Sequence, residues 1–102
     1  MGLYWGENTG HRSCLTTQRL ARQLRWARIG DTATLRTFLT ALDGEHRGEL
    51  RFTANQARQI MYALRWAEAR MRWFTLPGWT RLARILANDA EHAWRSGGWA
   101  IE

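Results

Sequence analysis

Apolar residues recur along the chain mostly at helical spacing, and the longest such pattern lies in the middle of the sequence. Between Thr53 and Phe74 they mark one face of a helix: Ala57, Ile60, Leu64, Ala67 and Met71. Thr53 and Gln56 have the spacing of a capping box, and Pro77 cannot continue the helix. The pattern predicts a helix of about 33 Å, at ~1.5 Å per residue, which is long enough to be the central element of the domain.

Two shorter helices are predicted before the central one. The first begins at Thr16 or Thr17 and ends at Gly30, because threonine caps helix starts and glycine is favoured just after helix ends. The second begins at Asp31 or Thr32 and ends at Asp43-Gly44. Their predicted buried positions are Leu20, Leu24 and Ala27 in the first helix and Leu35, Phe38, Leu39 and Leu42 in the second. A charged loop is expected at residues 45–49.

After the central helix, the sequence predicts a fourth helix over residues 79–95. Gly97-Gly98 is expected to end it, since glycine adopts the left-handed conformation that closes many helices. Its apolar face is rich in alanine and comprises Trp79, Leu82, Ala83, Leu86, Ala90 and Ala93. Such a face allows a neighbouring helix to approach closely.

Three short segments have the composition of β-strands, namely residues 3–5, 50–52 and 99–101. We expect them to pair into a minor two- or three-stranded sheet, and we expect Glu7 to Ser13 to form a polar loop. The predicted fold class is therefore mainly α. It is one helical domain over residues 1–102, with four helices and the long third helix at its centre.

The charge of the chain is strongly basic and comes from one residue type. The chain has 15 basic residues against 9 acidic ones, a net charge of +6, and every basic residue is arginine. The planar guanidinium binds carboxylates and phosphates through paired hydrogen bonds, so this composition favours recognition of anions or nucleic acid. The alternative is that a GC-rich genome, whose codons favour arginine, set the composition.

Arginine and aromatic residues also gather on helix faces outside the main apolar stripes, and seven tryptophans are difficult to bury in so small a core. On the first helix these residues are Arg19, Arg22, Arg25 and Trp26. On the third helix they are Arg58, Tyr62, Arg65, Trp66, Arg72 and Trp73. We take these ten as the candidate site. The alternative is that the tryptophans form a second buried face with arginine stems alongside them.

Two binding functions follow from these residue types. Trp, Tyr and Arg are enriched at the hot spots of protein interfaces, so our leading hypothesis is binding to a protein partner or a second copy of the chain. The second hypothesis is sequence-nonspecific nucleic-acid binding, since arginines neutralise phosphates and aromatic rings stack on unpaired bases. No helix-turn-helix, zinc-finger or RNA-recognition pattern accompanies these residues.

Residues with catalytic or metal-binding chemistry are few. His11 and Cys14 have an H-x-x-C spacing, but structural zinc sites use four ligands in close pairs, and His46 and His92 are remote in sequence. No glycine-rich phosphate loop or nucleophile elbow occurs. We predict a non-catalytic protein without cofactor or metal, and an unrecognised small enzyme is a distant third hypothesis.

The expected location of the protein is the cytoplasm. Cys14 is the single cysteine, so no intramolecular disulfide can form, and a reducing compartment fits. The start of the chain lacks the basic and apolar regions of a signal peptide. No segment approaches the roughly 20 apolar residues that span a bilayer, so we expect no membrane partner.

The C-terminal half of the chain carries recognisable packing motifs. Phe52-Thr53 precedes the long helix, residues 76–93 read LPGWTRLARILANDAEHA, and Gly97-Gly98-Trp99 follows. With the Met1-Gly2 opening, these motifs resemble a family of short uncharacterised actinobacterial and actinophage proteins. The resemblance implies no activity, cofactor or catalytic residue. It is consistent with a phage or mobile-element protein that modulates a host component by binding it. The chain departs from the alanine-rich pattern of that family at Trp66, Trp73 and Trp94.

Overall fold

The computed structural model describes residues 3–44 and 50–101, apart from the side chain of Cys14. The predicted charged loop at 45–49, with His46, and the Met1-Gly2 opening lie outside the described residues. In chain order the elements are β1 (Leu3–Tyr4), β2 (His11–Arg12), α1 (Cys14–Trp26), α2 (Ala33–Leu42), β3 (Leu50–Thr53), α3 (Ala54–Met71), α4 (Pro77–Ser96) and β4 (Gly98–Ile101). The fold class is mainly α, as predicted from the sequence.

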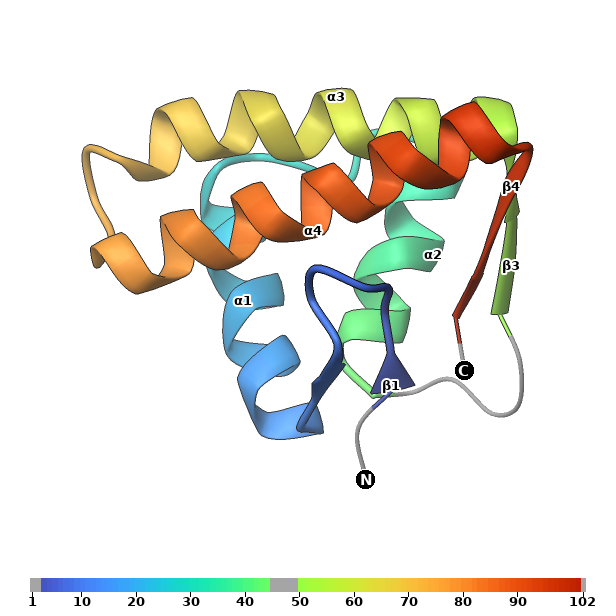
Figure 1. The fold of residues 1–102 in the computed structure, drawn as a ribbon. Coiled ribbons are helices and arrows are strands. Elements are labelled where there is room, and N and C mark those ends of the chain that lie inside the picture. The colour runs from blue at the N-terminus through green and yellow to red at the C-terminus, as the bar shows by residue number, and fades with distance from the viewer. Residues whose placement is uncertain (1–2, 45–49, 102) are drawn as a thin grey trace.

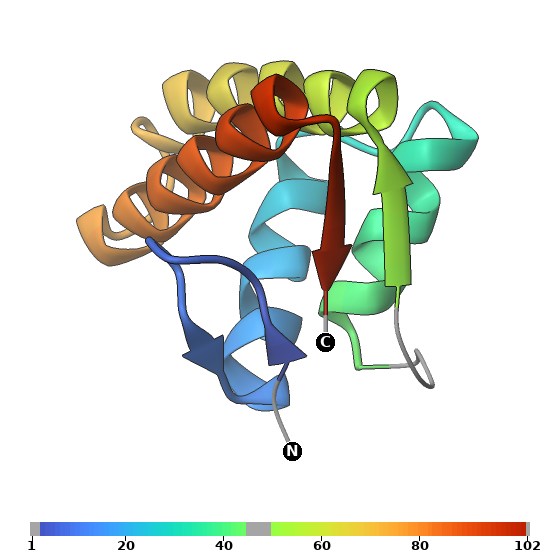
Figure 2. The same cartoon turned by 45° about the vertical axis from the view of Figure 1, so that its right-hand side comes forward.

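The long helices α3 and α4 lie side by side in opposite directions and cover α1 and α2 (Figures 1 and 2). The predicted apolar face of α3 is buried, and Met61 joins it. From α4, small side chains pack into the core at Ala83, Ala87 and Ala90, which lets the two helices approach closely. The predicted apolar positions of α1 and α2 are buried beneath this pair.

Four aromatic side chains fill the region between α2 and the β3–β4 sheet. Phe38 of α2 is surrounded by the rings of Trp5, Phe52 and Trp99, with centroid separations of 5.8, 6.3 and 5.9 Å. All four side chains are buried. Trp99 also donates a 2.8 Å hydrogen bond from Nε1 to the carbonyl oxygen of Trp5. Part of the tryptophan excess is therefore used in the core.

The strands pair differently from the prediction at the N-terminus. β3 and β4 form an antiparallel pair, as expected, in a register that places Phe52 opposite Trp99. However, β1, which lies in the predicted strand at residues 3–5, pairs with β2, which lies in the segment predicted to be a polar loop, and the two form a separate two-stranded sheet. A turn closes this hairpin, because Gly10 adopts a φ of 67° and its N–H donates to the carbonyl of Gly6 at 2.7 Å.

Helix ends follow the predicted caps at α2, at the start of α3 and at the end of α4, where Gly97 adopts a φ of 102°. Thr32 caps α2, and Thr53 and Gln56 form the predicted capping box. The start of α1 was predicted wrongly, because Ser13 provides its cap. The central helix ends at Met71 rather than Phe74. The turn of residues 72–76 must reverse the chain before Pro77 begins α4.

The end of α1 also differs from the prediction at Gly30. The helix ends at Trp26, and Arg28 is the residue in the left-handed region, with a φ of 64°. The N–H of Ile29 then reaches back to the carbonyl of Leu24 at 3.2 Å, as in a Schellman closure. This earlier ending allows the side chain of Ile29 to enter the core.

Asp89 of α4 fixes the N-terminal hairpin to the helix pair. Its carboxylate is buried and accepts hydrogen bonds from the backbone N–H of Asn8 at 3.0 Å and of Thr9 at 2.7 Å. The side-chain amide of Asn8 donates a third, at 3.1 Å. Gly6 lies so close that a Cβ there would come within 2.5 Å of Asp89 Cγ. The hairpin therefore requires both a carboxylate at 89 and a glycine at 6.

Candidate binding surface

Three aromatic side chains along and just beyond α3 are exposed to solvent. The exposed fractions are 59% for Tyr62, 50% for Trp66 and 85% for Trp73. Tyr62 and Trp66 are one helical turn apart on the side of α3 that faces away from its buried residues, and Trp73 follows in the turn after the helix. We call these three residues the α3 aromatic face. They do not form the second buried face that the sequence left open.

Arginine side chains pack against aromatic rings on the same side of the molecule. The guanidinium carbon of Arg70 lies 4.7 Å from the centre of the Trp66 ring. Arg58 lies 5.9 Å from the ring of Trp94, and that ring is 6.5 Å from Tyr62. Both arginines are exposed, so these cation–π contacts leave their N–H donors available to a partner. Sequence reasoning missed Arg70, although its position four residues after Trp66 places it on the same face.

Arg65, by contrast, helps to hold the two long helices together. Its Nη2 donates to Oδ1 of Asn88 at 3.0 Å and lies 3.6 Å from Oε1 of Glu91. A second tie joins Arg84 and Glu68 at 2.7 Å. Arg65 is therefore engaged within the fold, whereas Arg58, Arg70 and Arg72 remain exposed beside the aromatic face.

A cleft of about 690 Å³ opens beside the aromatic face, between α3 and the connection from α1 to α2. It is lined by Arg28, Ile29, Asp31, Leu35, Tyr62, Ala63, Arg65 and Trp66. We call it the Tyr62–Trp66 cleft. The left-handed Arg28 stands at this cleft, and an L-residue in that conformation costs about 1–2 kcal/mol. Strained backbone of this kind is often found at functional sites.

The predicted residues of α1 line a different hollow. Arg22, Arg25 and Trp26, with Gln18 and Asp43, surround about 480 Å³ of space. Trp26 is 72% exposed, and Arg19 and Arg22 are exposed as well. Arg25 binds the carboxylate of Asp43 with both of its Nη atoms, so it joins α1 to the end of α2. Six of the ten candidate residues thus line these two hollows, three in each, and the other four, Arg19, Arg58, Arg72 and Trp73, line neither.

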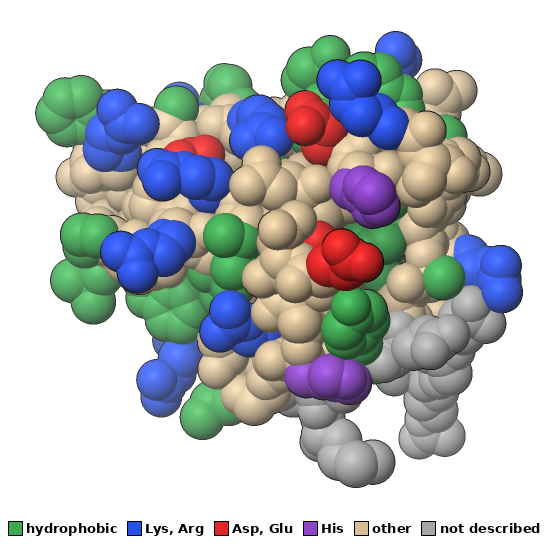
Figure 3. Space-filling model, viewed as in Figure 1, with side chains coloured by type: hydrophobic (Ala, Val, Ile, Leu, Met, Phe, Trp, Pro, Cys, Tyr) green, Lys and Arg blue, Asp and Glu red, His purple; other side chains and the backbone are tan. Residues whose placement is uncertain are grey.

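The face of the molecule on which α4 lies carries both arginine and hydrophobic side chains (Figure 3). Arginines are spread along α3 and α4, and hydrophobic side chains gather at the end where the two helices join. That end contains Trp73, Phe74 and Leu76, all exposed. Acidic side chains are few on this view, in line with the net charge of +6.

The sequence matches a known protein family over most of its length. A sequence profile described as "Domain of unknown function (DUF7739)" matches residues 5–102. The chain belongs to this family. The match extends well beyond the C-terminal half on which the resemblance rested, and the family description assigns no function. No curated protein and no solved structure shows a significant match.

None of the helices formed by residues 3–44 and 50–101 has the length and hydropathy to cross a membrane. Within the same ranges, no three His, Cys, Asp or Glu residues come together in an arrangement that could hold a metal ion.

Proposed function

We propose that this chain is a non-catalytic binding domain that recognises an acidic surface of a partner protein, in the cytoplasm. The α3 aromatic face and the Tyr62–Trp66 cleft would form the contact. The observation that carries the proposal is the exposure of Tyr62, Trp66 and Trp73 beside exposed arginines, in a chain that buries Trp5 and Trp99 in its core. Aromatic residues and arginine are the types that dominate interface hot spots.

Covering this face with a partner would contribute a large binding free energy for so small a domain. A tryptophan side chain buries roughly 200 Å² when it is covered, so complete coverage of Trp73 would remove up to about 170 Å² from water. At ~25 cal/mol per Å² this is at most about 4 kcal/mol, before the costs of association. Trp73, together with the half-exposed Trp66 and Tyr62, is enough for the centre of a specific interface.

The charge around the face favours a different protein over a second copy of this chain. A two-fold contact would bring the same surface of both molecules together. Arg58, Arg70 and Arg72 would then face the arginines of the other copy, and the total charge would be +12, from two chains of +6 each. Like charges placed together oppose association, whereas carboxylates on a partner would pair with these arginines.

Nucleic-acid binding is supported mainly by the α1 residues. Arg19, Arg22 and Trp26 are exposed together, and no carboxylate within the described residues makes an ion pair with either arginine. If these residues bind phosphates, affinity for a labelled oligonucleotide should fall with salt by about 0.9 log units per log of salt for each duplex phosphate neutralised. The affinity should also depend on Arg22 more than on Trp66.

The test of the leading proposal uses a photo-crosslinking amino acid. Benzoylphenylalanine would replace Trp66, and the control would place it at Thr37, an exposed position of α2 that lines neither hollow. We expect a protein adduct from position 66 that survives nuclease treatment, is absent with the Thr37 variant, and is strongly reduced when Trp73→Ser is added.

Three outcomes would overturn the proposal. Adducts that nuclease removes would indicate nucleic acid in place of a protein. Adducts of equal yield from positions 66 and 37 would show that the aromatic face has no special role. An adduct between two copies of the chain, together with a dimer in sedimentation, would make the face a self-association surface.

A further inference from the structure

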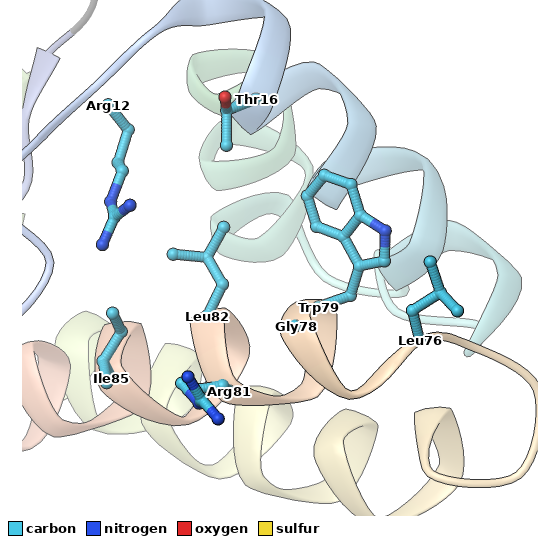
Figure 4. A pocket seen from close by; sticks show the side chains of 8 residues that line it. All are labelled: Arg12, Thr16, Leu76, Gly78, Trp79, Arg81, Leu82 and Ile85. Carbon is cyan, nitrogen blue, oxygen red and sulfur yellow. The ribbon is translucent and has the colours of Figure 1, made fainter.

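A further groove, separate from the Tyr62–Trp66 cleft, lies between α1 and the first half of α4. It encloses about 500 Å³ and shares no lining residue with that cleft. Thr16 of α1 and Leu82 of α4 face each other across it, and Trp79 and Leu76 continue it toward the start of α4 (Figure 4). Arg12 extends from β2 toward Ile85 at the other end.

We propose that this groove binds a small apolar carboxylate, with the acid group at Arg12 and the hydrocarbon along Leu82 and Trp79. The proposal goes beyond the proposed function, because it concerns a separate site and a different kind of ligand. It rests on the combination of an apolar groove with cationic ends and on the way in which the structure holds Arg12.

Arg12 is a half-buried cation whose position is fixed. Its Nε donates a 3.0 Å hydrogen bond to the carbonyl oxygen of Thr9, and Thr9 is itself held by Asp89. This leaves the Nη atoms of Arg12 as donors at the groove. Among the described residues, no acidic side chain lines the groove and none makes an ion pair with Arg12. A fixed guanidinium with open donors is well suited to a carboxylate, which it can bind through two parallel hydrogen bonds.

The remaining walls are suited to a hydrocarbon. Leu76, Trp79, Leu82 and Ile85 contribute apolar surface from α4 and the turn before it. Gly78 lacks a side chain, and a Cβ built there meets nothing within 4 Å, so this end of the groove is open. Arg81 stands on the α4 rim as a second cation. An anionic head and an apolar tail would thus both find matching surface.

The size of the groove favours a small ligand over a partner protein. Sites for small molecules enclose about 300–1,000 Å³ and are mostly apolar with a few placed polar groups. A stable protein interface covers roughly 800 Å² on each side, which is far more surface than these eight residues offer. We therefore assign the groove to a carboxylate with a hydrocarbon tail.

The experiment uses dodecanoate, below its micelle concentration, titrated into the 15N-labelled protein and followed by NMR. Dodecyltrimethylammonium provides the same tail with the opposite charge, and acetate provides the head without the tail. We expect saturable shifts from dodecanoate at the amides of Thr16, Gly78 and Leu82, and at least about tenfold weaker binding of both control compounds. Equal binding of the cationic compound would overturn the proposal, as would shifts centred on Tyr62 and Trp66.

Variants make the test specific to the groove. Arg12→Gln should weaken dodecanoate binding about tenfold or more, whereas Arg36→Gln, a matched loss of one exposed arginine on α2, should leave it unchanged. Leu76→Asp should weaken dodecanoate binding about tenfold, because it replaces apolar groove surface by a carboxylate. The fold should be kept, because Leu76 is 71% exposed and aspartate is favoured at its N-cap position. Unchanged binding in Leu76→Asp would overturn the proposal even if Arg12→Gln failed to fold.

The two proposals can fail separately. Trp73→Ser should strongly reduce the protein adduct formed at position 66 but leave dodecanoate binding intact. If dodecanoate does not bind and Leu76→Asp instead removes the adduct formed at position 66, the groove belongs to the protein interface, and the carboxylate site is refuted.

Discussion

Replacement of Arg28 by glycine should stabilise the fold, although arginine is the better helix former. Arg28 has a φ of 64°, where an L-residue costs about 1–2 kcal/mol and glycine costs little. Glycine also lowers the free energy of unfolding by roughly 0.5–1 kcal/mol, because it makes the unfolded chain more flexible. The Schellman hydrogen bonds that close α1 use only backbone atoms and are kept. The expected net gain is therefore about 0.5–1 kcal/mol in the free energy of unfolding.

The measurement is urea unfolding followed by circular dichroism, with thermal unfolding as a second reading. A gain of this size raises the melting temperature of a domain near 100 residues by roughly 2–8 °C. The control is Arg36→Gly within α2, where the backbone is helical and glycine should cost about 1 kcal/mol. The same substitution should thus shift stability in opposite directions at the two positions.

A second reading of Arg28→Gly concerns function. If the guanidinium at the Tyr62–Trp66 cleft pairs with a carboxylate of the partner, the stabilised variant should give less of the adduct formed at position 66. If Arg28→Gly and Arg36→Gly destabilised the fold to the same extent, the left-handed conformation at residue 28 would be refuted. Greater stability with an undiminished adduct would show that Arg28 has no part in recognition.

Other predictions concern the hairpin and the tryptophans. Gly6→Ala should destabilise the fold by several kcal/mol, because the new Cβ meets Asp89, whereas Gly10→Ala, with open space around it, should cost about 1–2 kcal/mol in urea unfolding. Asp89→Ala should cost roughly 3 kcal/mol or more and abolish amide-exchange protection in the hairpin, since three N–H groups lose their acceptor. Trp73→Ser should change stability by less than about 0.5 kcal/mol, whereas Trp99→Ser should cost at least about 3 kcal/mol. Acrylamide should quench Trp73 and leave Trp99 protected.

The helices could be predicted from the sequence because their signals are local. Apolar spacing placed the buried faces of all four, and Thr32, Thr53 and Gln56 gave caps that the structure confirms. The end of α1 could not be predicted in this way. Gly30 is the better left-handed residue by composition, but tertiary packing of Ile29 decides the position and leaves the strain on Arg28.

The N-terminal hairpin shows the same limit. Residues 7–13 have no apolar alternation, so nothing local distinguishes β2 from a loop. The partner that orders this segment is Asp89, which lies about eighty residues later in the chain. An aspartate next to Ala90 on an otherwise apolar face is the one signal that could have indicated a buried polar contact.

Part of the candidate site could also be predicted from the sequence, because helical spacing is a local signal. Tyr62 and Trp66 could be placed on one face of the long helix by spacing alone, and the structure leaves both exposed. The roles of Arg25 and Arg65 could not be foreseen, because each is fixed by a residue from another helix, Asp43 or Asn88. The cleft beside Tyr62 depends on how the α1–α2 connection packs against α3, which no local pattern encodes.

The two proposed sites depend on different parts of the fold. The Tyr62–Trp66 cleft is built on α3 and the α1–α2 connection, and the α3–α4 ties support it. The groove depends on a chain of contacts from Asp89 to Thr9 and from Thr9 to Arg12. The carboxylate that orders the hairpin also positions the guanidinium of Arg12. Loss of Asp89 should therefore disturb the groove more than it disturbs the α3 aromatic face. The buried aspartate therefore links the order of the N-terminal hairpin to the charge presented at the groove.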